Sequence, residues 1–406
     1  MLNDSSAPTR SATIRTVGAV ADVGRAMWDA LANPGWPSDA PLAAGNTGAL
    51  PYNPFLSFDF LDCLEQSGST GGKTGWTPSH VLLDDGSGGL GGIMPAYLKT
   101  HSMGEYVFDH GWAEAFQRNG ARYYPKLQCS VPFTPATGRR LLVPPGDAGA
   151  AIALARGATG IAAAGRMSSV HVTFMPEDEW ELCATLGYLK RTDAQFHFEN
   201  PGYRDFEDFL AAFASRKRKA VHRERREALA NGVTVEFLTG PSITGQAWDA
   251  FFAFYMETGS RKWGSPYLNR RFFSLIGERM ADRVLLIMAK RDGRYVAGAL
   301  NFIGSETLFG RYWGAIEQHP FLHFEVCYYQ AIDWAITHRL GRVEAGAQGE
   351  HKLARGYMPT PTYSAHWIAD PRYRDAISAY LVREREQAAA DVEMLAEHAP
   401  FRHEQD

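Results

Sequence analysis

The stretch TIRTVGAVADVGRAMWDAL, residues 13–31, recurs in outline as TVEFLTGPSITGQAWDAFF at residues 234–252. Each segment is typical of an alternating strand, a turn that contains glycine, and a helix that carries the tripeptide Trp-Asp-Ala. Similarity between distant parts of one chain is the signature of internal duplication, and it constrains the fold before any single element is assigned. The sequence therefore predicts two copies of one structural unit.

Further pairs of segments match in the same order along the chain. They are NPFLSFDFLDCL (53–64) with SPYLNRRFFSLI (265–276), SHVLLDDGSGGLGGIMPAYL (79–98) with RVLLIMAKRDGRYVAGALNFI (283–303), EYVFDHGWAEAFQ (105–117) with ETLFGRYWGAIEQ (306–318), and LGYLKRTDAQFHF (186–198) with RGYMPTPTYSAHW (355–367). Trp112 meets Trp313 in the third of these pairs, and His197 meets His366 in the fourth. Because the order never changes, duplication explains the matches better than chance does.

The pattern within each copy predicts an α/β fold, a mixed sheet of the α+β kind flanked by helices. We expect a disordered N-terminus, a first domain, a basic joining helix, a second domain, and a C-terminal helix with a tail, at 1–12, 13–202, 203–232, 233–372 and 373–406. In the first copy, residues 122–145 are rich in proline and glycine, so they are expected to form an inserted loop.

Composition narrows the class of protein. The chain has 406 residues, a formal net charge of −4 and a pI near 6.4, which argues against general coating of DNA or of a membrane surface. Its 4 cysteines form no CxxC pair, a pattern typical of reduced thiols. The N-terminal stretch lacks the apolar run of a signal peptide, and no segment is apolar enough to span a membrane. We expect a cytoplasmic protein, and the sequence leaves its oligomeric state open.

The joining segment carries positive charge at helical spacing. Arg216, Lys219 and Arg223 recur on one face of the expected helix, where a phosphate-rich ligand would find several cations in a row. A solvated face, partly neutralised by Glu224 and Glu227, is the alternative interpretation.

Three stretches carry a resemblance to a known family. They are YYPKLQCSVPFTPATGRRLL (123–142), SRKRKAVHRERREALANGVTVE (215–236) and HFEVCYYQAIDWAITHRLGRVEAGAQGEHKLARGY (323–357). With the duplicated order of elements, they resemble the FemAB-like branch of the GNAT acyltransferase superfamily, and in particular predicted N-acyltransferases related to peptidoglycan biosynthesis. The resemblance covers roughly residues 13–370 and implies two GNAT-type domains in tandem.

The acyl donor is the least determined part of this interpretation. GNAT proteins that use acetyl-CoA hold its pyrophosphate on a turn of pattern Q/R-x-x-G-x-G/A at a helix N-terminus. The second copy reads QHPFLHFE (318–325), without glycine, whereas the first offers QRNGAR (117–122), which keeps Gln117 and Gly120. The FemAB resemblance instead implies aminoacyl-tRNA, which we slightly prefer. An acyl-CoA or acyl-carrier-protein donor, and a binding protein without catalysis, remain as alternatives.

The resemblance also places the reaction. In the GNAT fold the acyl group enters a gap between two parallel strands, here LFGRYWGA (308–315) and RVEAGA (342–347), which makes Trp313 and Gly314 donor-binding candidates. Transfer to an amine requires donors for the developing oxyanion and a group that accepts the proton. Glu350 and His351 follow the second strand and are the candidates for the proton.

Comparison of the two copies supports a functional role for Lys352, the residue that follows His351 in this turn. Without gaps, Glu350, His351 and Lys352 align with Glu181, Leu182 and Cys183, so only the second copy has the His-Lys pair. A residue needed for folding alone should suit both copies, and this asymmetry favours a functional role in the second domain. The resemblance implies a lysine here that meets the donor, and Lys352 fits that role.

The remaining candidates complete the predicted site. Tyr357 joins the catalytic set; the donor-binding set also includes Gln348, Arg355, His323 and Glu325; Asp109, His110 and Trp112 are candidates for an acceptor cleft. We expect no tightly bound cofactor and no metal, although His323, Glu325, Glu350 and His351 would be the set to hold one. The expected partners are an amine-bearing small molecule or cell-wall precursor and, for the preferred donor, charged tRNA, but not DNA.

Overall fold

The computed structural model describes residues 13–36, 50–263, 266–346 and 349–402, so the tail expected at residues 1–12 lies outside the described residues. Its helices are α1 Arg25–Ala32, α2 Phe58–Gln66, α3 His110–Arg118, α4 Ala148–Ala164, α5 Glu177–Thr185, α6 Phe206–Ala211, α7 Ser215–Ala228, α8 Gly245–Trp263, α9 Arg270–Arg279, α10 Leu322–Phe324, α11 Gln330–Thr337 and α12 Pro371–Ala396. Short 3₁₀ helices and one π-helical turn, Glu325–Tyr329, supplement them.

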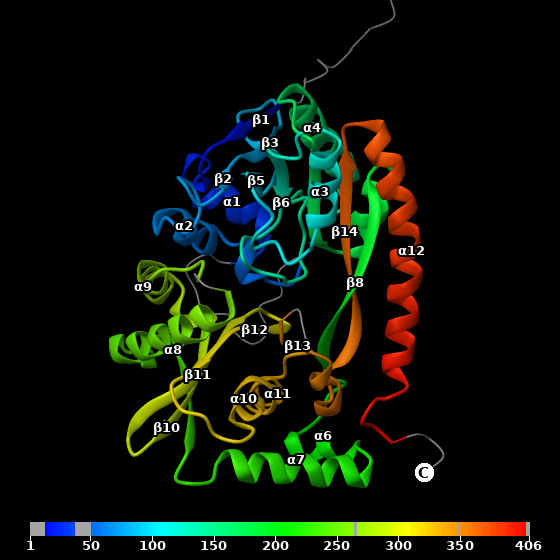
Figure 1. Cartoon of the computed structure of the whole chain (residues 1–406). Helices are drawn as coiled ribbons and strands as arrows, with labels where there is room; N and C mark the ends of the chain where they lie inside the picture. The colour runs from blue at the N-terminus through cyan, green and yellow to red at the C-terminus, as the bar shows by residue number, and fades with distance from the viewer. Residues whose placement is uncertain (1–12, 37–49, 264–265, 347–348, 403–406) are drawn as a thin grey trace, which may run out of the picture.

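The strands form a mixed α/β structure with those helices (Figure 1). They are β1 Thr13–Val17, β2 Trp76–Pro78, β3 His80–Asp84, β4 Leu90–Met94, β5 Ala96–Lys99, β6 Lys126–Cys129, β7 Ser169–Met175, β8 Leu189–Glu199, β9 Thr234–Thr239, β10 Val284–Arg291, β11 Arg294–Ile303, β12 Thr307–Ala315, β13 Arg342–Glu344 and β14 Met358–Ile368. In the described part of the chain, β1-β3-β4 form a small sheet and an 11-stranded sheet runs in the order β2-β5-β6-β7-β14-β8-β13-β12-β11-β10-β9.

The last strand of each copy pairs with the other copy. β14 lies between β7 and β8, antiparallel to both, and β8 in turn pairs with β13 of the second half. Along the β8–β14 pair, Met358 faces His197 and His366 faces Leu189, so the two strands are related by an approximate two-fold axis. Figure 1 shows these long strands side by side, bridging the two halves of the molecule. The match between 186–198 and 355–367 therefore identifies equivalent strands.

The predicted match between residues 105–117 and 306–318, by contrast, is wrong. Residues 110–118 form helix α3, whereas the segment aligned with them lies in strand β12. The true counterpart of β12 is β6, because β6 pairs in parallel with β7 as β12 does with β13. Trp112 and Phe116, four residues apart, are buried on one face of α3, and this helical spacing outweighs the similarity to a strand. The inserted segment 122–145 thus contains a strand of the main sheet rather than only a loop.

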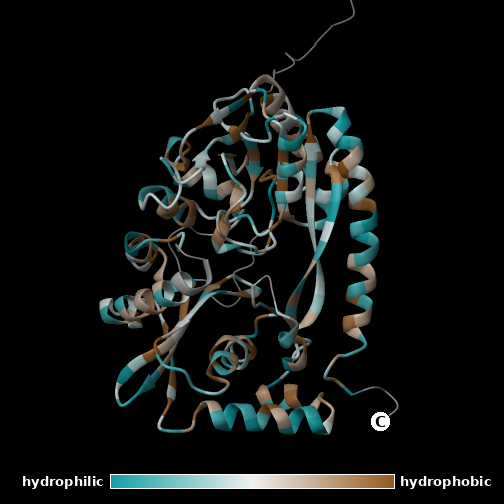
Figure 2. Ribbon diagram, in the orientation of Figure 1, coloured by the Kyte–Doolittle hydropathy of each residue, from teal (hydrophilic) through white to brown (hydrophobic). Residues whose placement is uncertain are grey.

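The joining segment forms helices α6 and α7 instead of a single helix. Asp205 caps α6 as expected, because its side chain accepts a hydrogen bond from the Asp208 N–H. Buried Phe213 lies between the helices and contacts Phe401 near the C-terminal end of the chain. In Figure 2 the ribbon of α7 is mostly coloured hydrophilic. Helix α6 instead buries Phe206, Phe209 and Leu210.

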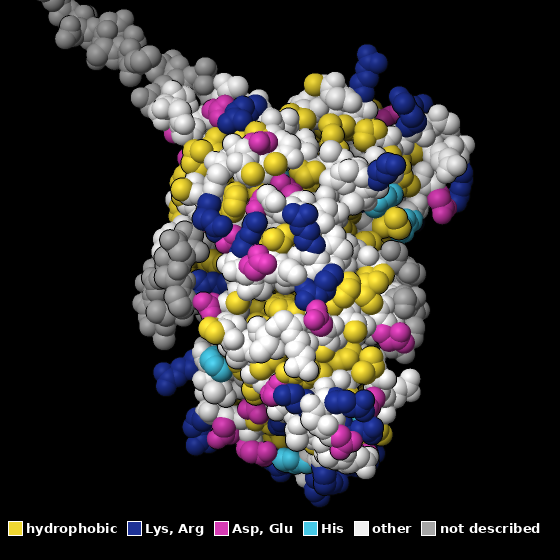
Figure 3. Space-filling model, turned by 90° about the vertical axis from the view of Figure 1, so that its left-hand side faces the viewer, with side chains coloured by type: hydrophobic (Ala, Val, Ile, Leu, Met, Phe, Trp, Pro, Cys, Tyr) yellow, Lys and Arg dark blue, Asp and Glu magenta, His cyan; other side chains and the backbone are white. Residues whose placement is uncertain are grey.

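The hydrophobic core crosses the boundary between the halves. The ring of Phe60 on α2 lies 5.9 Å from that of Phe272 on α9, and the ring of Phe55 lies 5.0 Å from that of Phe302 on β11. Figure 3, which views the flank formed by α2, α8 and α9, shows hydrophobic side chains gathered across this junction. Shared core and shared sheet together make the two halves one packing unit.

We predict that the variant Ala365→Asp is less stable than the wild type and that its two halves unfold in a single transition. Ala365 is fully buried in β14, opposite Val172 of β7 and Lys190 of β8. An ionised carboxylate there should lower the free energy of unfolding by about 3 kcal/mol or more. Urea unfolding followed by circular dichroism and by tryptophan fluorescence should show one transition at a lower midpoint.

The matched control is Pro361→Asp, an exposed position on the same strand, which should change the free energy of unfolding by no more than about 0.5 kcal/mol. Two separate transitions in Ala365→Asp, with one half unaffected, would contradict the shared unit.

Candidate functional site

The central feature of the site is a gap between two parallel strands. β12 and β13 are paired only from Thr307 to Phe309 and from Arg342 to Glu344, and they then diverge. Gly310 stands at the point of divergence, where a Cβ atom would lie 3.3 Å from the Glu344 carbonyl oxygen and 3.3 Å from Asn301 Oδ1. A larger residue at position 310 would crowd these oxygen atoms, and beyond this point the two strands are no longer paired.

A cavity of about 590 Å³ lies at this gap, where Gly310 and Ala345 line it, and both halves of the chain contribute to its walls. The first half contributes Ser102, Met103, Gly104, Tyr106, Phe108, His110 and Pro135. From α8 and the segment after it, the second half contributes Tyr255, Thr258, Gly259 and Tyr267. It also contributes His323, Cys327, Tyr328, His351 and Lys352. Its size lies within the range of about 300–1,000 Å³ typical of small-molecule sites.

Lys352 is a buried cation in the wall of this cavity. It is 1% exposed, and its Nζ donates a hydrogen bond of 2.7 Å to the Gly346 carbonyl. Burial lowers the pKa of Lys352 to about 8, and the positive charge of Arg311 acts in the same direction. The 3₁₀ helix Glu350–Arg355 holds it in place between Gly349 and Gly356, both of which have positive φ. Lys352 therefore lines the cavity from the turn that follows β13.

His351 lies beside Lys352 and lines the same cavity. Its Nε2 is 2.9 Å from the hydroxyl of Tyr328, whose pKa burial raises above its ordinary value. Glu350 begins the same 3₁₀ helix, and Gln348 lies outside the described residues. The imidazole of His351 and the amine of Lys352 thus lie on one wall with the phenol of Tyr328, which comes from the π-helical turn.

Other predicted residues in this region support the wall from behind. Arg355 pairs with Glu224 on α7 at 2.9 Å, and its guanidinium lies 3.4 Å from the centre of the Phe324 ring. Buried Glu325 pairs with Arg225 of α7 at 3.1 Å. These side chains do not line the cavity; they tie the wall to α7.

The remaining donor candidates differ in position. Trp313 and His323 line the cavity, with ring centres 5.2 Å apart. Gly314 packs instead against α8, where a Cβ atom would lie 2.1 Å from the Phe254 carbonyl oxygen. Tyr357 is fully buried, and its hydroxyl donates to the Tyr328 carbonyl at 3.3 Å. Tyr357 thus contacts the cavity wall through Tyr328 and through its backbone N–H, which donates to the Lys352 carbonyl at 3.3 Å.

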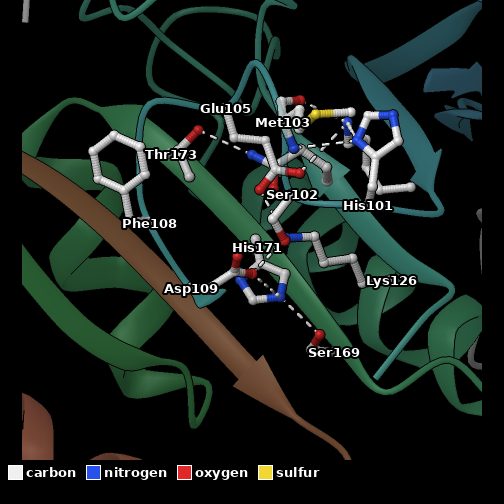
Figure 4. Close-up of polar contacts among 12 residues, drawn as sticks. His101, Ser102, Met103, Glu105, Phe108, Asp109, Lys126, Ser169, His171 and Thr173 are labelled. Carbon is white, nitrogen blue, oxygen red and sulfur yellow. Dashed lines mark hydrogen bonds and ion pairs between the residues drawn. The ribbon is translucent and has the colours of Figure 1, made fainter. Parts of the chain in front are cut away.

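Of the predicted acceptor residues, Asp109 belongs to a buried charged cluster beneath the loop that forms the first-half wall (Figure 4). Lys126 Nζ donates to Ser102 at 2.9 Å, to Glu105 at 2.7 Å and to Asp109. Burial opposes ionisation of Asp109, but Lys126 and His171 hold its pKa well below the usual range. Asp109 therefore fixes this loop, while His110, the next residue, reaches the cavity.

Trp112 extends this cluster along the sheet. Its ring centre lies 4.9 Å from that of His366, whose Nδ1 is 2.7 Å from His171 Nδ1. Burial lowers the pKa of His171 to about 3, so the imidazole is neutral at physiological pH. Trp112 is covered by this packing and does not line the cavity.

Sequence reasoning missed Arg311 and Glu344. Arg311 lines the cavity from β12, and one of its terminal nitrogens donates to the Phe133 carbonyl. Glu344 ends β13 at the gap, and burial raises its pKa to about 7 against the opposing effect of Arg342. The available signal for Arg311 was a charged residue within a stretch that is otherwise apolar, aromatic or glycine, and for Glu344 an acid at the end of a short strand.

The equivalent gap in the first half is filled. β6 and β7 are paired from Leu127 to Cys129, and beyond them lies Arg140, which is 1% exposed. Its guanidinium donates to the carbonyls of Thr173, Ala136 and Gly138 at 2.8–2.9 Å. An acyl group has no room here, so the cavity at the gap belongs to the second half.

The segment QRNGAR does not form a pyrophosphate turn. It lies at the C-terminal end of α3, where backbone carbonyls rather than free N–H groups are exposed. The helix that follows β6 in the chain, α4, begins at Ala148 and is capped by Asp147, whose side chain accepts the Ala150 N–H. A carboxylate at this position would repel a pyrophosphate. The structure therefore does not support CoA binding at 117–122, the alternative that the sequence left open.

A duplicated mixed sheet with a cleft between splayed parallel strands defines a tandem GNAT-type α/β protein, as the sequence indicated. The structure aligns with the crystal structure of FemX at a TM-score of 0.51 and 13% identity, covering 81% of this chain and 96% of FemX. It also aligns with L-PGS from Bacillus licheniformis (TM-score 0.47, 10% identity, 82% of this chain and 98% of that one) and with a tandem GNAT protein from the clavulanic acid biosynthesis pathway (0.42, 12%, 89% and 99%).

The chain belongs to the FemAB-like family, described as peptidoglycan biosynthesis/recognition, whose model matches residues 19–403. No curated protein sequence matches the chain. Family membership supports a transferase connected with peptidoglycan. Within the described residues, no helix is both long and apolar enough to cross a membrane.

We predict that Lys352→Met stabilises the protein near pH 7. The pKa of Lys352 is lowered from 10.5 to about 8 on folding, so the unfolded chain binds more protons between these values and stability rises with pH there. The variant avoids this unfavourable burial of charge, and its free energy of unfolding at pH 7 should exceed that of the wild type by about 2 kcal/mol.

Urea unfolding at pH 7 and pH 10 tests this expectation, because the difference should shrink to less than about 1 kcal/mol at pH 10. Lys290→Met, which removes a more exposed lysine paired with Glu236, is the control and should not be stabilising. If the free energy of unfolding of Lys352→Met at pH 7 were lower than that of the wild type, burial of the Lys352 charge would not be unfavourable as expected.

Proposed function

We propose that the protein is an N-acyltransferase that moves an aminoacyl or acyl group to an amine by direct aminolysis, with aminoacyl-tRNA as the preferred donor. The observation that carries the proposal is the position of Lys352, a buried cation on the wall of a cavity that lies at the gap between splayed strands. The acceptor is an amine-bearing small molecule or a cell-wall precursor, in agreement with the family description.

The cavity offers two sides for two substrates. The donor lies on the side of His323, His351 and Lys352, and its carbonyl reaches the gap at Gly310. The acceptor amine approaches from the side of Tyr255, Tyr267 and the first-half loop. Holding both groups at the gap makes the encounter effectively intramolecular, which lowers the entropic part of the barrier.

The chemistry requires no covalent intermediate on the protein. The amine nitrogen attacks the acyl carbon, and the C–N bond forms as the carbonyl oxygen becomes an oxyanion near the Lys352 ammonium. His351, hydrogen-bonded to Tyr328, takes the proton from the amine. Collapse of the oxyanion then breaks the bond to the donor, and the leaving oxygen of tRNA, or sulfur of CoA, receives a proton.

The position of α7 favours a polyanionic donor. Arg216, Lys219 and Arg223 are exposed on α7, which packs against the π-helical turn that carries Cys327 and Tyr328. The Glu224–Arg355 pair joins the same helix to the turn that holds Lys352. A nucleic acid bound along α7 therefore lies behind the donor wall, with its phosphates near several cations.

The second candidate donor, acyl-CoA or acyl-carrier protein, is favoured by the acidic net charge of the chain. Neither half offers it a glycine-rich turn at a helix N-terminus. In the second half α10 begins at Leu322 after Phe321, which has a positive φ of 58°, and Pro320 lacks an N–H donor. We therefore rank this donor second.

Donor consumption tests the proposal. Purified protein with labelled charged tRNA, in an extract of small molecules and cell-wall precursors, should release label faster than spontaneous hydrolysis does. Lys352→Ala should slow this release at least about 100-fold, in the range found when one oxyanion donor is removed. Lys290→Ala is the matched lysine control and should retain full activity.

Three outcomes separate the candidate functions. Release from acetyl-CoA but not from tRNA would favour the second donor. Release from neither, unaffected by Lys352→Ala, would favour a binding protein on the tandem scaffold. Release from charged tRNA that Lys352→Ala leaves unchanged would move the transfer site away from this cavity.

A second prediction concerns α7. Reversing the charge of Arg216, Lys219 and Arg223 to glutamate should raise KM for charged tRNA at least about 10-fold and flatten its salt dependence, because phosphate contacts release fewer counterions. The value of kcat should change little, since these side chains do not line the cavity. Steady-state kinetics at several salt concentrations measures both quantities.

The matched control is Arg372→Glu with Arg383→Glu, which reverses exposed arginines on α12. An equal effect of both sets on KM would indicate general electrostatic attraction rather than a tRNA site on α7.

A further inference from the structure

Two cations approach the same cavity from opposite sides of the gap. Arg311 extends from β12, and Lys352 from the 3₁₀ helix that follows β13. Their mutual repulsion contributes to the low pKa of Lys352. Two like charges that face one cavity repel each other, and a bound anion would relieve the repulsion.

Neither cation has a carboxylate within 4 Å among the residues that the structure describes. Two buried cations elsewhere in the molecule do have one: Lys126 lies 2.7 Å from Glu105, and Arg355 lies 2.9 Å from Glu224. Buried Arg140 has none, but its guanidinium is satisfied by three backbone carbonyls. Arg311 donates to the Phe133 carbonyl, and its Nε is buried without a hydrogen-bond partner in the described part of the chain. Glu344 interacts with Arg311 only over a longer distance.

The surroundings of Arg311 lie on the acceptor side of the gap. Its guanidinium is 5.9 Å from the ring centre of Tyr106 in the first-half loop and 5.1 Å from that of Tyr312. Tyr255 and Tyr267 line the same part of the cavity. An anion held here would be surrounded by aromatic walls and would be far less hydrated than at the surface. An ion pair with Arg311 is therefore stronger in this cavity than it would be at the surface.

We propose that Arg311 binds a carboxylate of the acceptor, so that the amine that receives the acyl group belongs to an amino-acid-type molecule. This inference rests on the proposed function for the assignment of the acceptor side. A planar guanidinium matches a carboxylate through two parallel hydrogen bonds, and its unpartnered Nε–H supplies one of them. Lys352 remains across the gap for the donor, and the carboxylate fixes the distance of the amine from the acyl carbon.

Binding without a donor tests this proposal. The probes are 4-fluorophenylalanine, its carboxamide and 4-fluorophenyl phosphate, each added to the full chain at constant ionic strength and observed by ¹⁹F NMR line broadening. We expect the amino acid to bind at least about 10-fold more tightly than the amide, because only the acid offers a charged partner to Arg311. Arg311→Gln should reduce binding of the acid to the level of the amide.

Arg291→Gln is the matched control, since it removes an arginine that pairs with Glu317 outside the cavity, on strand β10, which β11 separates from β12 in the sheet. It should leave the binding of the acid unchanged. If Arg311→Gln does not fold, the acid–amide comparison in the wild-type protein and the variant Arg311→Lys, expected to retain part of the preference, still decide the question.

Equal binding of acid and amide, or no binding of either, would overturn the proposal. Binding of the phosphate alone, lost in Arg311→Gln, would reassign Arg311 to a phosphate-bearing ligand. Since no donor is present, these results are independent of the transfer assay, and a failure of one does not imply a failure of the other.

Discussion

The pairing of β8 with β14 is the constraint on which the rest of the structure depends. Each strand belongs by sequence to one copy and by hydrogen bonding partly to the other, so neither copy can complete its sheet alone. The 11-stranded sheet that results places the first-half loop 102–110 against the gap between β12 and β13. A cavity with walls from both copies follows directly from this exchange.

The two copies have diverged where the chemistry differs and not where the fold is formed. Both keep a parallel strand pair at the centre and a following helix, but the gap of the first copy is filled by Arg140 and that of the second is open. Buried charges follow the same division. In the first half they neutralise one another in the cluster of Lys126, Glu105 and Asp109, whereas Arg311 and Lys352 face the cavity. One copy thus acts as a scaffold and wall, and the other presents charge to a ligand.

Much of this could be predicted from the sequence. The repeats indicated the duplication, and comparison of the copies identified Lys352 and His351, because a difference between otherwise similar units needs no structure to detect it. The strand exchange could not be predicted, since nothing within residues 358–368 specifies which distant strand they pair with. The mismatch of α3 with β12 arose because Trp112 and Trp313 lie in similar short apolar contexts, which hydrophobic pattern alone cannot distinguish. Arg311 was missed because its importance comes from what it lacks, a neighbouring carboxylate, and that is a property of the folded molecule.

The exchanged strands also affect how the protein is made. Strand β7 acquires its neighbour β14 only when residues 358–368, far along the chain, have been synthesised. Until then one edge of the first half stays unpaired, with its backbone groups open to the wrong partner. Two independent domains would each close their own sheet, so the strand exchange prolongs the exposure of this edge during synthesis.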